Sequence, residues 1–103
     1  MIIFKDTVSD YLDGLVYNLY NNEYFGFIES SEAFVDRIID FIFENIEIIS
    51  SKKTPFEIQY LGSNYIFYKS TQRTTWYIFF EQRNIDFVIT NIINNNSEEV
   101  KFL

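Results

Sequence analysis

The sequence predicts a single α+β domain over residues 1–103: a short N-terminal strand, a helical hairpin, then an antiparallel meander of three to four strands. Two observations support this fold class. Apolar residues recur every three to four positions in the first half of the chain and mostly at every second position in the second half. The polar breaks in the second half are too short for parallel crossovers, so consecutive strands should run antiparallel.

The first half predicts a strand followed by a helix. Residues 1–5 form a short apolar run that is typical of a terminal strand. Over residues 6–22, apolar positions from Val8 to Tyr20 alternate at intervals of three and one, which predicts a helix with one buried stripe. Gly14 costs about 1 kcal/mol in a helix interior, so its presence predicts close packing against a neighbouring element.

A second helix is predicted over residues 31–49, after a link at 21–31 that is polar at both ends. Ser30 or Ser31 can accept hydrogen bonds from the first N–H groups of this helix. Its apolar stripe is wide, which indicates contact with both the first helix and a sheet. The main stripe consists of Val35, Ile38, Ile39, Ile42, Ile46 and Ile49.

The second half predicts strands and turns. Pro55 ends the helical region, and the lysines of residues 50–55 indicate a solvated loop. Residues 94–103 begin as a loop whose last residues dock or fray. The predicted strands, separated by polar turns, are 56–60, 65–69, 75–81 and 86–93.

The strands predicted at 75–81 and 86–93 are apolar on both faces. Helices on one face would leave the other open, because sheets of this kind often solvate one side. The open face can bind a partner or a second copy, be covered by the protein's own loops, or stack nucleic-acid bases. The partner-binding candidates are Trp76, Tyr77, Phe79 and Phe87. In the second strand, alternation groups Phe87, Ile89, Asn91 and Ile93 opposite Val88, Thr90 and Ile92.

The composition excludes several kinds of chemistry. Without cysteine or histidine the chain has no disulfide, no thiolate and no Ser-His-Asp arrangement, and it lacks the commonest metal ligands. Its three glycines are too far apart to form a phosphate-binding loop. We therefore expect no metal site and no cofactor.

The net charge of −7 is divided unequally along the chain. Residues 1–50 hold ten acids and two bases, whereas residues 51–103 hold five acids and six bases. A local basic surface can therefore exist on this acidic protein. Cationic side chains around a phosphate can stabilise the charge that develops when a ribose 2′-hydroxyl attacks it, without a metal. The candidates for this role are Lys69, Arg73 and Arg83, with Lys52, Lys53 and Lys101 as further bases. For Lys69, Arg73 and Arg83 the sequence favours a turn residue kept in water over a site residue, because surface bases are common.

Because the sequence predicts neither a signal peptide nor a membrane span, we expect a cytoplasmic protein. Lys5 and Asp6 interrupt the N-terminus before an apolar segment of useful length can form, so no signal peptide is expected. The most apolar stretch, residues 33–49, carries five charged residues and predicts no membrane span.

The order of these elements resembles the RelE/ParE family of type II toxins. The resemblance covers most of the chain, from MIIFK and the two helices through 65-YIFYK-69 to the last hairpin, 75-TWYIFFEQRNIDFVITNII-93. In that hairpin, an aromatic strand turns through polar residues into a strand that ends at Ile-Asn-Asn. The resemblance implies the predicted fold and one of two activities.

In this family the RelE branch cuts mRNA on the ribosome, the ParE branch inhibits DNA gyrase, and an antitoxin polypeptide across the sheet neutralises both. This chain lacks two features that the RelE branch has. It has no arginine inside the third strand, since the nearest base, Arg73, lies just before that strand, and it has neither His nor Tyr in residues 91–102. We therefore expect a toxin or toxin-like protein that acts by protein–protein binding, with an antitoxin or a second copy as partner. The alternatives are a metal-independent, ribosome-associated mRNA endoribonuclease and a non-enzymatic interaction protein of a phage or mobile element.

Overall fold

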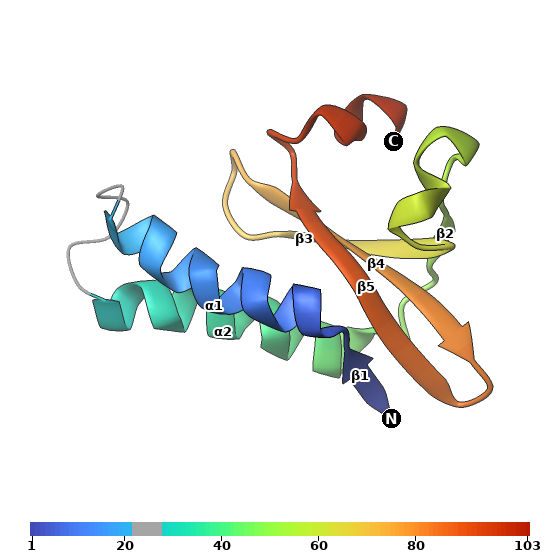
Figure 1. The fold of residues 1–103 in the computed structure, drawn as a ribbon, viewed down its shortest axis with the longest axis horizontal. Helices are drawn as coiled ribbons and strands as arrows, with labels where there is room; N and C mark the ends of the chain where they lie inside the picture. The colour runs from blue at the N-terminus through green and yellow to red at the C-terminus, as the bar shows by residue number, and fades with distance from the viewer. Residues whose placement is uncertain (22–27) are drawn as a thin grey trace.

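The computed structural model describes residues 1–21 and 28–103, so most of the link predicted at 21–31 lies outside the described residues (Figure 1). The predicted α+β class is confirmed, with a short strand and two helices before the remaining strands. In chain order the elements are β1 (Ile2–Phe4), α1 (Asp6–Asn21), α2 (Ile28–Asn45), β2 (Lys52–Lys53), the 3-10 helix η1 (Phe56–Leu61), β3 (Asn64–Lys69), β4 (Thr75–Arg83), β5 (Asp86–Asn94) and the 3-10 helix η2 (Glu98–Phe102).

The sheet is mixed. Its strand order is β1-β5-β4-β3-β2, and every neighbouring pair is antiparallel except β1 with β5. The predicted meander is confirmed for β3, β4 and β5. β1 can run parallel to β5 because the helices and the meander separate the two strands along the chain, whereas a tight turn would force an antiparallel pair. The Phe87 N–H donates to the carbonyl oxygen of Met1 at 2.9 Å, and the Lys5 N–H donates to that of Ile89 at 3.1 Å.

Both helices pack on one face of the sheet (Figure 1). Their buried positions recur every three to four residues, as the sequence predicts, and form one cluster with alternate residues of β4. Trp76 is 2% exposed, meets Phe34 edge to face with ring centroids 6.1 Å apart, and donates from Nε1 to Ser70 Oγ at 3.1 Å. This helix-side core consists of Val8, Leu12, Leu15, Phe34, Val35, Ile38, Ile42, Ile46, Ile66, Trp76, Ile78, Phe80, Phe87, Ile89 and Ile92.

The second helix differs from its predicted bounds of 31–49. It begins at Ile28, so that Ser31 lies inside the helix, fully buried, instead of capping it. It ends at Asn45, whose side-chain amide donates to the carbonyl oxygen one turn earlier at 2.9 Å. Beyond this end Ile46 is still buried, whereas Ile48 is 78% exposed.

Gly14 does not have the close packing that we predicted. A Cβ atom built at this position would have no heavy atom within 4 Å. The prediction fails because the neighbouring helix approaches α1 along the stripe of Leu12 and Leu15, to one side of Gly14.

Residues 56–60, predicted as a strand, form the 3-10 helix η1. Its buried residues are Ile58 and Leu61, three apart, whereas Phe56 and Tyr60 are 84% and 71% exposed. The backbone has a kink at Ile58, where two short turns join, and both Ile58 and Leu61 are buried against the sheet. In a strand, residues three apart would point to opposite faces. The strand that pairs with the outer edge of β3 is instead β2, inside the predicted loop at 50–55.

A bulge in β5 changes which of its residues face the helices. Phe79 pairs with Asn91 and Phe80 pairs with Ile89, which leaves Thr90 as the extra residue. The predicted alternation is therefore wrong from Asn91 onward. Two consecutive residues, Thr90 and Asn91, point away from the helices and donate side-chain hydrogen bonds to the carbonyl oxygen of Leu61 in η1. The helix-facing residues of β5 are Phe87, Ile89 and Ile92.

Candidate functional site

The sheet face opposite the helices is covered at one end by η1. Ile58 and Leu61 of η1 pack there against Tyr65 and Phe79 in a second, smaller core. Gly62 follows η1 with φ of +152°, and a Cβ atom there would lie 3.0 Å from both the Phe79 Cβ and the Phe80 backbone nitrogen. Glycine therefore lets η1 approach the bulged region of the sheet closely.

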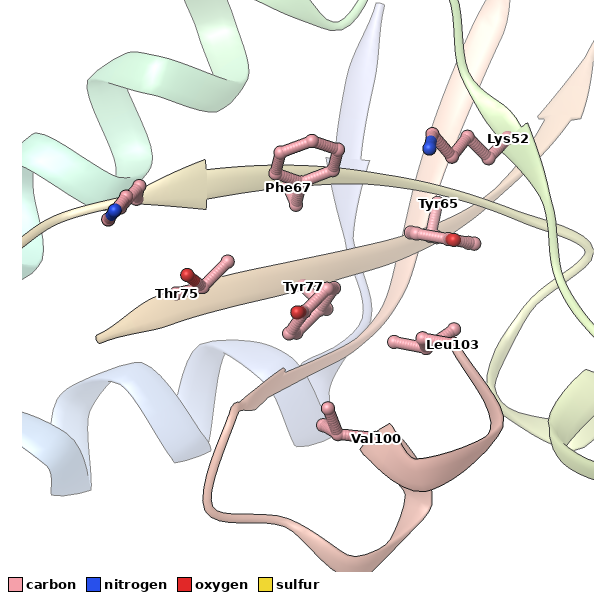
Figure 2. Close-up of a pocket in the computed structure, with 8 residues that line it drawn as sticks. Lys52, Tyr65, Phe67, Thr75, Tyr77, Val100 and Leu103 are labelled. Carbon is pink, nitrogen blue, oxygen red and sulfur yellow. The ribbon is translucent and has the colours of Figure 1, made fainter. Parts of the chain in front are cut away.

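The other end of this face is a groove of about 270 Å³ (Figure 2). Its floor comes from β3 and β4, one edge from β2 and one wall from η2. Phe67 is 49% exposed and Tyr77 is partly exposed, so aromatic surface remains in contact with water. We call this the sheet groove; its lining residues are Lys52, Tyr65, Phe67, Lys69, Thr75, Tyr77, Val100 and Leu103.

The wall from η2 is thin. Val100 and Leu103 face the tyrosines across the groove in Figure 2. None of the residues of η2 is buried. An exposed hydrogen bond of 3.4 Å from the Tyr60 hydroxyl to Glu99 joins η2 to η1. The groove is therefore bounded on this side by a segment with little apolar anchoring.

The sheet groove is locally basic although the chain is acidic. Lys52 and Lys69 line it from β2 and β3, and the Lys52 ammonium lies 5.6 Å from the centroid of the Phe67 ring. Neither lysine has a carboxylate within ion-pair distance in the part of the chain that the structure describes. Both charges are therefore available to an anionic group placed over the aromatic floor.

Two phenols lie on the floor between these lysines. The Tyr65 and Tyr77 ring centroids are 6.2 Å apart. Burial, and secondarily the neighbouring Tyr77 phenol, raise the pKa of Tyr65 above its ordinary value. Tyr65 therefore keeps its proton at neutral pH, so its hydroxyl can donate a hydrogen bond or act as an acid, but not as a base.

The three bases predicted to surround a phosphate do not form one cluster. Lys69 lines the sheet groove, whereas Arg73 lies in the exposed β3–β4 turn, outside the lining residues. Arg83 lies at the other end of β4 from Thr75, about 26 Å away at the usual rise per residue of a strand. The base that joins Lys69 in the groove is Lys52.

The four predicted partner-binding aromatics are in three different environments. Trp76 and Phe87 are buried in the helix-side core, and Phe79 is fully buried beneath η1. The expectation that these three rings lie on an open face is therefore wrong, because the helices and η1 cover them. Tyr77 alone of the four lines the sheet groove.

Sequence reasoning missed several lining residues of the groove, among them Phe67, Val100 and Leu103. Phe67 shares a face with Tyr65, so the two-residue period of β3 was a sufficient signal. In the predicted tail, Val100 and Leu103 are three positions apart. A single interval of three residues does not identify a 3-10 turn unless the surface that it packs against is known.

Comparisons of the chain with protein-family models, with curated proteins and with solved structures find no significant match. No helix within residues 1–21 and 28–103 has both the length and the apolar character needed to cross a membrane. The assignment of function therefore rests on the geometry of the groove.

Proposed function

We propose that this protein is a divergent RelE/ParE-like toxin, or a toxin-like protein, that acts by binding other polypeptides in the cytoplasm, and that an antitoxin segment occupies the sheet groove. The observation that carries the proposal is the groove itself: exposed aromatic surface between two lysines that have no carboxylate partner among the described residues. The order of strand, helical hairpin and meander supports the family assignment by resemblance.

The chemistry of the groove defines the segment that it fits. An apolar side chain can pack on Phe67 and Tyr77, and tyrosine is among the residues that most often dominate binding energy. Acidic side chains on either side of that apolar residue can pair with Lys52 and Lys69. The best fit is an extended acidic segment with an apolar residue at its centre.

The groove by itself is too small for a stable complex. A groove of about 270 Å³ has room for only a few side chains. Specific interfaces bury about 1,200–2,000 Å² in total and involve many more residues on each side. Tyr60 of η1 is 71% exposed and donates a hydrogen bond to Glu99 of η2, so its ring can extend the contact. The exposed ring of Phe56 on the same element can extend it further. A partner that passes from the sheet groove over η1 therefore fits better than a small molecule. In this proposal the target of toxic action, gyrase or the ribosome, is distinct from the antitoxin segment that occupies the sheet groove.

The proposal predicts a small antitoxin gene adjacent to the gene of this protein, and co-expression of the two products tests it. We expect a stable complex whose affinity falls about tenfold or more when Phe67 and Tyr77 are both replaced by alanine, because anchor residues contribute more than 1 kcal/mol each. Tyr17→Ala is the matched control, since Tyr17 is a similarly exposed aromatic residue on α1 that does not line the sheet groove. Absence of any complex, or equal weakening by the control, contradicts the proposal.

A metal-independent ribonuclease is the second candidate, favoured by the convergence of Lys52, Lys69 and two phenols in one groove. Such an enzyme would cleave RNA, alone or on ribosomes, in the presence of EDTA, and would lose activity on Lys69→Ala while Arg83→Ala remained active. Intact RNA under all these conditions eliminates this candidate. Binding without toxicity or cleavage would instead indicate the non-enzymatic interaction protein.

A further inference from the structure

A second groove lies on the other side of the molecule, between β1, α1 and α2. Its volume is about 270 Å³. Phe43 of α2 is 56% exposed at its edge, and its ring centroid lies 5.9 Å from that of Phe4. We call this the helix groove; its lining residues are Phe4, Ser9, Leu12, Asp13, Ile39 and Phe43.

Acidic residues flank the helix groove on both helices. On α1, Asp6, Asp10 and Asp13 are exposed at helical spacing, and Asp13 lines the groove. On α2, Asp36 and Asp40 are exposed on the same side of the helix as Phe43. None of these five carboxylates has an ion-pair partner among residues 1–21 and 28–103.

This arrangement lowers the stability of the isolated helices. Like charges at spacings of three and four repel each other on a helix, and α2 has acidic residues near its C-terminus, where the helix dipole favours bases. The bases of residues 1–50 are Lys5 and Arg37, and the Arg37 guanidinium lies 5.9 Å from the centroid of the Phe34 ring, on the side of α2 away from Phe43. A cationic partner in the helix groove would relieve this repulsion.

We propose that the helix groove binds a basic, amphipathic polypeptide segment. One apolar side chain of the partner packs between Leu12, Ile39 and Phe43, and its lysines or arginines face Asp13, Asp36 and Asp40. Charge complementarity selects this occupant, since an acidic segment would be repelled and a second copy of this chain also carries a net charge of −7. This site is independent of the sheet groove, whose lysines select the opposite charge.

The test uses a fluorescein-labelled peptide of leucine, lysine and alanine, about 16 residues long, with leucines at helical spacing. Its binding to the full chain is measured by fluorescence anisotropy at low and at physiological salt. We expect the double variant Asp36→Asn, Asp40→Asn and the single variant Phe43→Ser each to weaken binding about tenfold. Circular dichroism confirms that each variant is folded.

The matched control is Glu57→Gln, Glu98→Gln, which removes two exposed charges from η1 and η2, on the face of the sheet opposite the helices. It should change the affinity by less than about twofold, because screening in physiological salt limits exposed charges to about 8 Å. Equal weakening by both double variants, no effect of Phe43→Ser, or equal binding of a peptide with glutamates in place of lysines each overturns the proposal.

Self-association is measured on the same samples by sedimentation. A dimer that Phe43→Ser dissociates, with no binding of the basic peptide, assigns the groove to a second copy and overturns the proposal. Phe67→Ala should leave peptide binding unchanged, so that failure here and failure of the sheet groove remain distinguishable.

Discussion

The two faces of the sheet are covered by very different amounts of structure. On one face lie α1 and α2, with 16 and 18 residues. On the other lie η1 and η2, with 6 and 5 residues. The helices bury a continuous core, whereas the 3-10 segments bury a small cluster at one end and leave the sheet groove at the other. The first face therefore supplies most of the stability, and the second retains surface for binding.

Neighbouring residues of β4 show this difference directly. Trp76 and Ile78 are buried under the helices, while Tyr77 between them lines the sheet groove. All three are apolar or aromatic, so the sequence pattern is the same on both faces. What differs is the length of the element available to cover each face.

Trp76→Ala should give the largest effect. It removes a ring that is 2% exposed and leaves the half-buried Ser70 hydroxyl without its donor, so we expect a loss of about 3–5 kcal/mol in the free energy of unfolding. Urea unfolding followed by far-UV circular dichroism measures this. The neighbouring Tyr77→Ala should cost less than half as much, and equal losses would show that the two faces contribute equally to stability.

The two glycines should respond in opposite directions. Gly62→Ala should destabilise the protein by about 1–3 kcal/mol, because its φ is unfavourable for alanine and the added Cβ meets the backbone of β4. Gly14→Ala should stabilise it by about 0.5–1 kcal/mol, because the added Cβ meets no neighbour and alanine favours the helix. Thermal unfolding of the two variants provides the comparison. A stabilised Gly62→Ala would mean that η1 does not pack closely on the bulge.

Thr90→Val should cost about 1 kcal/mol. It removes the buried hydrogen bond from the bulge to the carbonyl oxygen of Leu61, which keeps its second donor, Asn91. Denaturant unfolding combined with hydrogen exchange of η1 measures the change. The amides of η1 should exchange faster while those of α2 keep their rates; uniform acceleration would contradict a local role for this bond.

Alkaline pH should have the smallest effect. Because burial raises the pKa of Tyr65, the folded state retains a proton that the unfolded state releases near pH 10. Stability is therefore constant below about pH 10 and falls as pH rises through the folded-state pKa. Tyr65→Phe should flatten this dependence in unfolding measured from pH 8 to 11, values chosen to bracket about pH 10. If the free energy of unfolding of Tyr65→Phe fell with pH as steeply as that of the unaltered protein, the pH dependence would arise from other tyrosines.

The elements with a strong period could be predicted from sequence, and the others could not. The stripe of α1 and the alternation of β4 identify their buried residues directly. The stretch FEIQY at 56–60 alternates like a strand, yet it is η1, because Ile58 and Leu61 are buried together. Periodicity alone cannot distinguish the two for five residues.

The sheet groove could not be predicted in full, because it is formed by contacts between residues far apart in the sequence. The bulge at Thr90 moves Asn91 and Ile93 to the side of η1, and nothing in the sequence of β5 marks it, since no glycine is present there. Lys52 lines the groove because β2 pairs with β3, although the segment that contains β2 is predicted to be a loop. Of the predicted site residues, Lys69 and Tyr77 lie in the groove. Both could be predicted because a clear alternation of apolar and polar residues places each of them on a strand.

Lysine reactivity in the complex with the adjacent gene product tests the central claim most directly. Amine acetylation followed by mass spectrometry reports each lysine separately in the unmodified chain. If the partner occupies the sheet groove, Lys52 and Lys69 should react more slowly in the complex than in the free protein, while Lys5, beside α1, keeps its rate. Unchanged rates at Lys52 and Lys69 in a stable complex, or protection at Lys5 alone, would show that the partner binds elsewhere.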